Sequence, residues 1–485
     1  MNRQLKRVGV VVLLLFGALF VNLNVISLLL ADDLATHPAN RRLIVREYAI
    51  ERGPLIVGEE AIARSEETGG ELRFLRSYSE GPRYAHLTGY YSVTLQRSGL
   101  EDALNADLTG RPTEVVAQNL GELIGARDRP GNAVQLTIDP AAQAAAERAL
   151  GERIGAVVAI DPVTGAVLAS YSNPTFDPNP LSSHDRQEIT DTWLPLRDDP
   201  TQPLLDRTRQ ERYPPGSVFK LVVAAAALER GLQPDSSFPD ELVYDVPQTT
   251  SDIGNYGGGL CADGDTISLA DAMRVSCNTV FARLGVELGA DALVEQAERF
   301  GFNRAIPYEL DVVPSLIPDA DDLDPPATAQ SSIGQRDVAA TPMQLAVVAA
   351  SIANGGQLVR PHVVAAVLDP SGRRLRGPAS AAWTGPGLNG AAIAPRTADQ
   401  LRDMMLAVVD AGTGTRAQID GVEVGGKTGT AEVPDGPPVT WFAGFADQRV
   451  AVAVVVPGAV DDETGGGVAA PIAREVMAAV LGAGS

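Results

Sequence analysis

The sequence predicts an α+β fold in which a central antiparallel sheet carries helices on both faces. Apolar runs typical of strands occur at residues 155–160 and 166–171, and again at residues 440–445 and 450–456 near the end of the chain. Segments with helical patterns fill the sequence between these two pairs. Strands at both ends with helices between them favour a single sheet packed by helices, rather than alternating parallel units.

The first pair of strands is joined by a tight turn, Asp161-Pro-Val-Thr-Gly165, and is preceded by a helix. Asp139 is a good N-cap and Pro140 suits the first helical position, so we expect that helix to end near residue 150. The other helices are expected at residues 217–230, 269–275, 342–353, 397–409 and 470–481.

Length and composition are those of a globular protein with two or three domains. The chain has 485 residues, of which 45% are hydrophobic and 21% charged. The net charge of −22 argues against a nucleic-acid partner, because phosphate contacts require clustered cations.

An apolar run at residues 8–30 is long enough to span a membrane. Arg3, Lys6 and Arg7 precede it, so the positive-inside rule predicts a cytoplasmic tail at residues 1–7 and an extracytoplasmic remainder. A cleaved signal peptide is the alternative, but its apolar core is usually shorter. We therefore expect a single-pass protein of the cell membrane.

Two domains are predicted after this anchor. Residues 31–130 have mixed short segments without recognisable chemistry and are interpreted as a pedestal domain. The run ARDRPG at residues 126–131 is typical of a linker, and residues 131–485 form the second domain.

Lysine is unusually rare. The chain has 39 lysine and arginine residues, and only Lys6, Lys220 and Lys427 are lysines. Arginine stays protonated in proteins, whereas a buried lysine amine can become neutral and act as a base. Lys220 and Lys427 are therefore candidate catalytic residues.

Three short motifs contain these lysines or polar partners for them. Ser217-Val-Phe-Lys220 places a hydroxyl and an amine one helical turn apart. Ser276-Cys277-Asn278 follows a short amphipathic helix, and Lys427-Thr428-Gly429-Thr430 follows two glycines that would permit close approach of a ligand. The first two motifs each have an ordinary structural interpretation, an exposed helix lysine for the first and a helix stop for the second.

The third motif also has a competing interpretation. Residues 421–428, GVEVGGKT, satisfy the phosphate-loop pattern of nucleotide hydrolases. A phosphate loop precedes a helix, but Gly429 and Pro434 follow here, and residues 422–424 are typical of a strand. This P-loop NTPase remains only a remote alternative.

Taken in order, S-x-x-K, S-x-N and K-T-G resemble the signature of penicillin-binding proteins and serine β-lactamases. Residues 131–485 are similar to the transpeptidase domain of class B penicillin-binding proteins, and the N-terminal part is most similar to the actinobacterial PbpA type. The resemblance implies the penicilloyl-serine transferase fold. The D-R-x-G sequence usual after the first Arg-Gly is replaced here, because Gly53 is followed by Pro-Leu-Ile-Val-Gly.

The resemblance implies a role for each motif residue. Ser217 would be the nucleophile and Lys220 its base, since none of the four histidines lies in a relevant motif. Ser276 and Lys427 would form the proton network, Asn278 would hold the substrate peptide, and Thr428, Gly429 and Thr430 would bind its carboxylate.

The resemblance also implies the reaction and the partners. The expected substrates are peptidoglycan stem peptides ending in D-Ala-D-Ala, cross-linked in cell-wall synthesis for cell division or cell shape, and β-lactams would acylate the same serine. A polytopic glycosyltransferase and division or elongation proteins are expected partners. A D,D-carboxypeptidase or β-lactamase is the alternative, but the E-x-x-x-N loop of class A lactamases is missing, with Glu309 the nearest candidate. A non-catalytic sensor or scaffold is a further alternative.

Two questions stay open in the sequence. Cys261 and Cys277 either form a disulfide or remain two buried thiols. No histidine pair or cysteine cluster has metal-ligand spacing, so we expect no metal and no cofactor.

Overall fold

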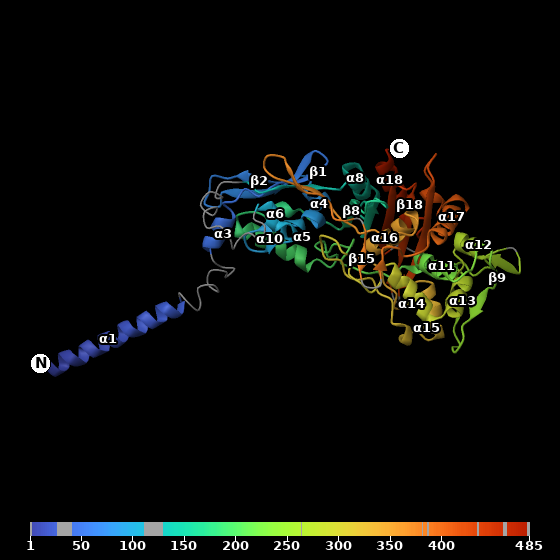
Figure 1. Ribbon diagram of the computed structural model, residues 1–485, viewed down its shortest axis with the longest axis horizontal. Helices are drawn as coiled ribbons and strands as arrows, with labels where there is room; N and C mark the ends of the chain where they lie inside the picture. Colours follow the sequence, from blue (N-terminus) through green and yellow to red (C-terminus); the bar gives the residue numbers. More distant parts are fainter. Residues whose placement is uncertain are drawn as a thin grey trace.

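The computed structural model describes residues 2–26, 41–110, 130–262, 264–380, 382–385, 388–433, 436–458 and 463–482. Helix α1 (Asn2–Asn24) projects away from the body of the molecule (Figure 1). Its segment Lys6–Asn24 has a mean hydropathy of 2.0 and is not buried, so its length and composition suit a membrane span. The last part of the predicted span, residues 27–30, lies outside the described residues.

The part of the molecule nearest α1 is built on a six-stranded sheet. Its strand order is β14-β13-β6-β1-β2-β3, and every pair is antiparallel except β1 with β6. The strands are β1 (Leu55–Val57), β2 (Glu60–Glu67), β3 (Phe74–Tyr78), β6 (Ala133–Leu136), β13 (Val364–Leu368) and β14 (Arg374–Arg376). Strands from both sides of residue 130 therefore share one sheet. Most of the predicted linker at residues 126–131 lies outside the described residues.

A buried ionic cluster holds this N-terminal part together. Glu101, in α5 (Gly99–Ala103), accepts hydrogen bonds from Arg52 at 2.7 Å and from Arg76 at 2.6 Å. Burial alone would raise the pKa of Glu101, but the two guanidinium groups hold that pKa below its usual range. The bond between Glu101 and Arg76 joins α5 to β3 of the sheet. Removing one of the three charged side chains would leave an uncompensated buried charge and destabilise this part of the protein.

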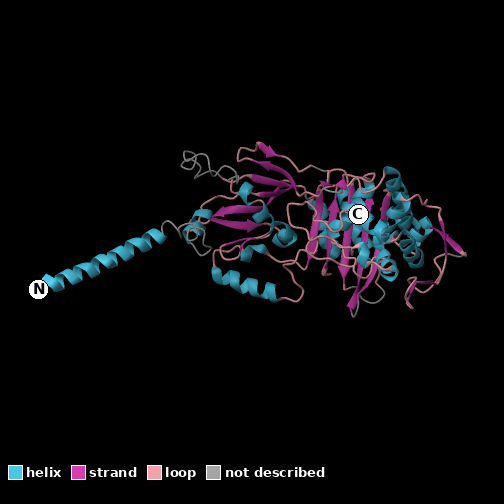
Figure 2. Cartoon of the chain, turned by 60° about the horizontal axis from the view of Figure 1, so that its bottom comes forward, coloured by secondary structure: helices cyan, strands magenta, loops and turns pink. Residues whose placement is uncertain are grey.

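The second sheet is the predicted central sheet. Its five strands run β17-β18-β19-β7-β8, and all neighbours are antiparallel. Figure 2 shows strands lying among helices in this part of the molecule, away from α1. The strands are β17 (Val424–Val433), β18 (Gly436–Ala446), β19 (Val450–Pro457), β7 (Gly155–Ile160) and β8 (Val167–Asn173). The prediction that the last strands return to the first is confirmed.

Both faces of this sheet are covered by helices. In β7, Ala156 and Val158 belong to one buried apolar cluster, whereas Val157 and Ala159 belong to another. Alternate residues of a strand point to opposite faces, so an uninterrupted apolar run is what a doubly covered strand requires. The second cluster includes α8 (Pro140–Leu150) and α18 (Ala469–Leu481), and the first includes α16 (Pro342–Ala353).

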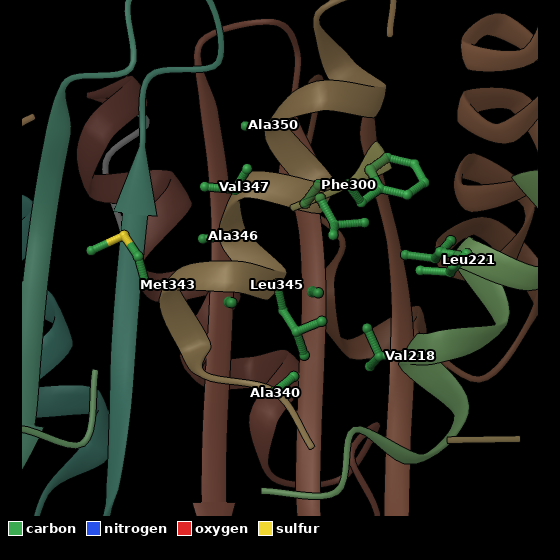
Figure 3. Close-up of a cluster of buried hydrophobic side chains, with 14 of the residues drawn as sticks. Val218, Leu221, Phe300, Ala340, Met343, Leu345, Ala346, Val347 and Ala350 are labelled. Carbon is green, nitrogen blue, oxygen red and sulfur yellow. The ribbon is translucent and has the colours of Figure 1, made fainter. Parts of the chain in front are cut away.

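Helix α16 shares one buried apolar cluster with the central sheet and with the segment that contains Ser217. Figure 3 shows its Met343, Leu345 and Val347 among buried side chains that include Val218 and Leu221. This shared cluster packs the S-x-x-K segment against the same core as the sheet.

The predicted helices agree closely with the structure. Asp139 caps α8 by accepting hydrogen bonds from the backbone N–H groups of Ala141 and Ala142 at 2.8 and 3.0 Å. The prediction of one continuous helix from Ser217 to Arg230 is wrong at its start, because residues Gly216–Phe219 form a 3₁₀ turn, η3, before α11 (Lys220–Glu229). The predicted helix at 397–409 is longer, and forms α17 (Pro395–Ala411).

The remaining helices and strand pairs complete the fold. The helices are α3 (Arg41–Glu47), α4 (Gly81–Thr88), α6 (Asn105–Leu108), α9 (Pro178–Leu181), α10 (Arg186–Asp198), α12 (Leu269–Val275), α13 (Asn278–Leu288), α14 (Ala290–Arg299) and α15 (Pro325–Ser332), with 3₁₀ turns η4 (Ala320–Asp322) and η5 (Thr415–Ala417). The two-stranded pairs are β4 (Tyr91–Ser92) with β5 (Gln96–Arg97), β9 (Ser237–Pro239) with β12 (Thr266–Ser268), β10 (Val243–Asp245) with β11 (Asp252–Gly254), and β15 (Thr384–Gly385) with β16 (Leu388–Asn389).

Candidate active site

The three sequence motifs lie around one cleft. Its volume is about 1500 Å³, and its lining includes Ser217, Ser276, Asn278, Thr428 and Thr430. The fold thus brings together residues that are far apart in the sequence. Lys220 and Lys427 lie behind this lining and are fully buried.

Ser217 lies in η3, which packs closely against β17. Gly216 has a φ of 52°, and a Cβ atom there would lie 2.9 Å from the carbonyl oxygen of Thr430. Its N–H donates to the carbonyl oxygen of Gly334 at 2.9 Å. Side chains at i and i+3 eclipse in a 3₁₀ turn, so this geometry puts Ser217 and Lys220 on the same side.

Lys220 donates its hydrogen bonds to the second motif. Its Nζ lies 2.7 Å from the carbonyl oxygen of Ser276, 2.7 Å from Oδ1 of Asn278 and 3.3 Å from Oγ of Ser276. Burial, and then the charge of Lys427, lower the pKa of Lys220 well below its ordinary value. The environment therefore favours the neutral amine.

The hydrogen bonds of Lys220 also orient that neutral amine. A neutral amine has two N–H bonds and one lone pair, and the two nearest acceptors of Lys220 are both carbonyl oxygens that cannot donate. Both hydrogens are thereby occupied. The lone pair is left for a hydroxyl proton, which is the arrangement that a general base requires.

Lys427 approaches the same serine from the other side. Its Nζ donates to Oγ of Ser276 at 2.8 Å and to the carbonyl oxygen of Thr428 at 3.0 Å. Burial lowers the pKa of Lys427 to about 7. The Ser276 hydroxyl thus lies between two buried amines whose pKa values are both lowered.

Ser276 is held in an uncommon backbone conformation. It follows α12 and has a φ of 63°, in the left-handed region that residues other than glycine rarely adopt. This turn ends α12 and lets α13 begin two residues later at Asn278. Non-glycine residues in such conformations are frequent at functional sites.

The K-T-G motif lies inside β17, a strand at the edge of the central sheet. Lys427 pairs with Ala443 and Thr430 with Thr440 in a regular antiparallel ladder. The phosphate-loop interpretation is therefore wrong, because that loop must leave a strand and enter a helix.

The two glycines before Lys427 serve packing rather than ligand approach, which corrects the sequence interpretation. A Cβ on Gly425 would lie 2.4 Å from Cζ of Phe445, and a Cβ on Gly426 would lie 2.2 Å from Cζ of Phe442. The Phe445 ring therefore occupies the space beside Gly425 in one apolar cluster, and the Phe442 ring occupies the space beside Gly426 in the other.

Two contacts of the threonines involve residues that sequence reasoning missed. Oγ1 of Thr428 lies 2.6 Å from Oγ1 of Thr413, and Oγ1 of Thr430 accepts from the N–H of Gly465 at 3.2 Å. Thr413 stands in a Gly-Thr-Gly-Thr sequence like that of the third motif, and this repetition was the available signal.

Cys261 and Cys277 form a disulfide with a Cα–Cα distance of 5.8 Å. The structure thereby answers the question that the sequence left open. Asp240 lies close to both sulfur atoms, but its two oxygens accept the N–H groups of Cys261 and Ala262 at 2.9 and 2.6 Å. Because both sulfurs are bonded to each other, this group offers no thiolate to a metal.

Glu309 does not take the place of a lactamase base. Its carboxylate accepts the N–H of Val363 at 3.0 Å and the N–H of Val364 at 3.3 Å, and it does not line the cleft. This carboxylate supports the N-terminal sheet at β13.

Comparisons with known proteins agree with this geometry. Residues 155–478 match the penicillin-binding protein transpeptidase domain, and residues 52–134 match the penicillin-binding protein A dimerisation domain. The chain is 40% identical to the peptidoglycan D,D-transpeptidase PbpA of Mycolicibacterium smegmatis, with 100% of both chains covered.

Solved structures give the same result. The chain is similar to penicillin-binding protein A from M. tuberculosis in its imipenem acyl-enzyme complex, with a TM-score of 0.83, 37% identity, and coverage of 90% of this chain and 100% of that chain. The penicillin G acyl-enzyme complex gives a TM-score of 0.82 at 36% identity, covering 89% and 100%. The chain therefore belongs to the penicillin-binding protein transpeptidase family.

Proposed function

We propose that this protein is a peptidoglycan D,D-transpeptidase that cross-links stem peptides through an acyl-enzyme on Ser217. The observation that carries the proposal is the environment of Lys220, a fully buried amine whose two short hydrogen bonds go to carbonyl oxygens. A buried neutral amine one turn from a serine can accept the serine proton without a histidine.

In the first step, Oγ of Ser217 attacks the carbonyl carbon between the two terminal D-alanines while Lys220 accepts its proton. The peptide C–N bond breaks, and the departing D-alanine nitrogen receives a proton. Ser276 relays that proton, because its hydroxyl lies within hydrogen-bond distance of both Lys220 and Lys427. The product is an ester between Ser217 and the donor peptide.

In the second step, an amine of a neighbouring stem peptide attacks the ester carbonyl. A new amide forms, the amine gives up a proton, and Ser217 recovers its own. The two lysines return to their starting protonation states, so the reaction needs no metal, oxidant or cofactor.

The strand β17 and the turn η3 supply the remaining groups. The N–H groups of Ser217 and Thr430 would form the oxyanion hole, where losing one donor typically costs about 3 kcal/mol of transition-state stabilisation. The hydroxyls of Thr428 and Thr430 bind the terminal carboxylate. Asn278 contacts the substrate backbone from the opposite side of the cleft.

We infer that α1 anchors the protein with residues 1–7 in the cytoplasm, since Arg3, Lys6 and Arg7 precede the apolar segment. The cleft then faces the extracytoplasmic side, where peptidoglycan lies. We further propose residues 31–130 as the pedestal and 131–485 as the transpeptidase domain, with β6, β13 and β14 extending the pedestal sheet. A polytopic glycosyltransferase and division or elongation proteins remain the expected partners.

The rival function is hydrolysis, as in a D,D-carboxypeptidase or a β-lactamase. The two are distinguished by incubating the full-length protein in detergent with a D-Ala-D-Ala donor peptide and an acceptor peptide with a free side-chain amine. Mass spectrometry should find the cross-linked dimer, and Ser217→Ala should abolish it. Release of D-alanine with hydrolysed donor alone would support the hydrolase instead.

A further inference from the structure

Two residues at the end of β11, Gly254 and Asn255, form hydrogen bonds to the second motif although they belong to none of the three motifs. Oδ1 of Asn255 accepts the N–H of Asn278 at 3.0 Å and the N–H of Thr279 at 3.1 Å. The carbonyl oxygen of the preceding residue, Gly254, accepts from Nδ2 of Asn278 at 3.1 Å. The dipeptide Gly254-Asn255 therefore contacts both the backbone and the side chain of Asn278.

These contacts fill a gap in the capping of α13. The first N–H groups of a helix have no partner within the helix and are usually satisfied by an oxygen of the N-cap side chain. Cys277 holds the N-cap position of α13, but its sulfur is bonded to Cys261 and it makes no capping hydrogen bond. Asn255, the residue that follows β11, supplies the missing acceptor.

The same contacts decide which end of the Asn278 amide faces Lys220. Nδ2 of Asn278 is held by the carbonyl oxygen of Gly254, so Oδ1 is the atom directed at Nζ of Lys220, at 2.7 Å. A reversed amide would place two N–H donors against the amine and remove one of its two short acceptors.

Asn255 is itself held firmly in place. Its Nδ2 donates to the carbonyl oxygens of Glu241 at 3.0 Å and Gly259 at 3.1 Å. The Asn255 side chain thus forms four hydrogen bonds, two through Oδ1 and two through Nδ2. An asparagine with both ends engaged cannot rotate its amide without losing several bonds at once.

We propose that Asn255 is a positioning residue for the acylation reaction, holding Asn278 so that Lys220 keeps the geometry of a general base. The inference rests on the proposed function and deepens it by adding a residue outside the three motifs. Asn255 need not touch the reacting atoms. It acts through the start of α13.

The test is the rate of penicillin G acylation of the full-length protein in detergent, resolved into the non-covalent dissociation constant and the acylation rate constant. Asn255→Ala should lower the rate constant by about 10- to 100-fold, because small misplacement of a catalytic group is costly, and should leave the dissociation constant within about twofold. Asn255→Asp keeps an oxygen acceptor at the helix N-terminus but loses the two Nδ2 hydrogen bonds, so it should recover part of the lost rate.

Asn179→Ala is the matched control. Oδ1 of Asn179 accepts the N–H of Tyr78 at 2.9 Å and its Nδ2 donates to the carbonyl oxygen of Tyr78 at 3.0 Å, and Asn179 does not line the cleft. This variant should keep the wild-type acylation rate at a comparable loss of thermal stability. Equal rates for Asn255→Ala and wild type, or equal losses in the alanine and aspartate variants, would overturn the inference. If wild type itself is not acylated, the proposed function fails instead.

Discussion

Nζ of Lys427 lies 2.8 Å from Oγ of Ser276, and this contact joins the edge strand of the central sheet to the turn between α12 and α13. The hydroxyl of Ser276 is also 3.3 Å from Nζ of Lys220. One hydroxyl therefore connects both buried lysines. Proton transfer between the nucleophile side and the leaving-group side of the cleft can pass through this single atom.

Replacing the proposed base tests the role of Lys220. Lys220→Arg replaces the neutral amine with a permanently charged group that cannot accept a proton, so acylation by penicillin G should fall by at least about 100-fold. Stopped-flow or mass measurements of the acylation rate provide the readout. Because arginine is larger and the site is buried, Lys220→Met serves as a second variant, and its thermal midpoint reports folding. Near-normal acylation by either folded variant would exclude Lys220 as the base.

The depressed pKa of Lys427 predicts how stability depends on pH. The folded protein releases the Lys427 proton near pH 7, whereas the unfolded chain holds it until about pH 10.4. In this window the unfolded state binds more protons, so the contribution of Lys427 to stability is smallest below pH 7 and rises with pH, by up to about 1.4 kcal/mol per pH unit.

Urea denaturation at several pH values between 7 and 10 measures this slope. Lys427→Met should show a smaller slope than wild type, because the variant lacks the buried amine. Identical slopes in wild type and Lys427→Met would show that the buried amine does not titrate as proposed.

The disulfide should contribute more to the free energy of unfolding than to the rate of acylation. Reducing Cys261–Cys277, or replacing Cys261 by serine, should lower the free energy of unfolding by about 3 kcal/mol. Acylation should fall by less than about tenfold, because Asn255 still caps α13. Free-thiol titration with and without reductant follows the bond, and a double Cys261→Ser/Cys277→Ser variant should be insensitive to reductant. Two free thiols in the untreated protein would contradict the disulfide.

Adding a side chain to the glycine pair before Lys427 should disturb the packing of the sheet. In Gly426→Ala the new Cβ would lie 2.2 Å from Cζ of Phe442, so we expect a loss of about 1–3 kcal/mol of stability. A second change, Phe442→Leu, removes the clashing ring and should restore part of that loss. Gly264→Ala is the control, since its Cβ would meet nothing closer than 3.9 Å. Chemical denaturation of the three variants and the double variant measures these effects, and an undisturbed Gly426→Ala would contradict the packing.

Much of the fold could be predicted because the central sheet carries a strong local pattern. The run Val450–Val456 is apolar at every position, which suits a strand covered on both faces, and the N-cap Asp139 marks the start of α8 directly. The six-stranded sheet could not be predicted in the same way. It pairs β6 with β13, and nothing in either short segment specifies a partner so distant in the sequence.

The candidate site shows the same contrast between residues in local motifs, which could be predicted, and residues that act through tertiary contacts, which could not. Ser217, Lys220, Ser276, Asn278 and Lys427 stood in short motifs, and the scarcity of lysine drew attention to two of them. Asn255 and Thr413 were missed because their roles depend on tertiary contacts, with Asn278 and Thr428 respectively, that no local sequence pattern reveals. The function of Gly425 and Gly426 was misinterpreted because the rings that need the space lie on the neighbouring strand.

The most direct test is the intact mass of the full-length protein in detergent after exposure to penicillin G, for wild type and for Ser217→Ala. We predict that wild type gains the mass of one penicillin and keeps it through a long incubation, whereas Ser217→Ala gains none. An adduct on Ser217→Ala, or no adduct on wild type, would contradict acylation of Ser217, and an adduct that disappears within seconds would indicate a hydrolase.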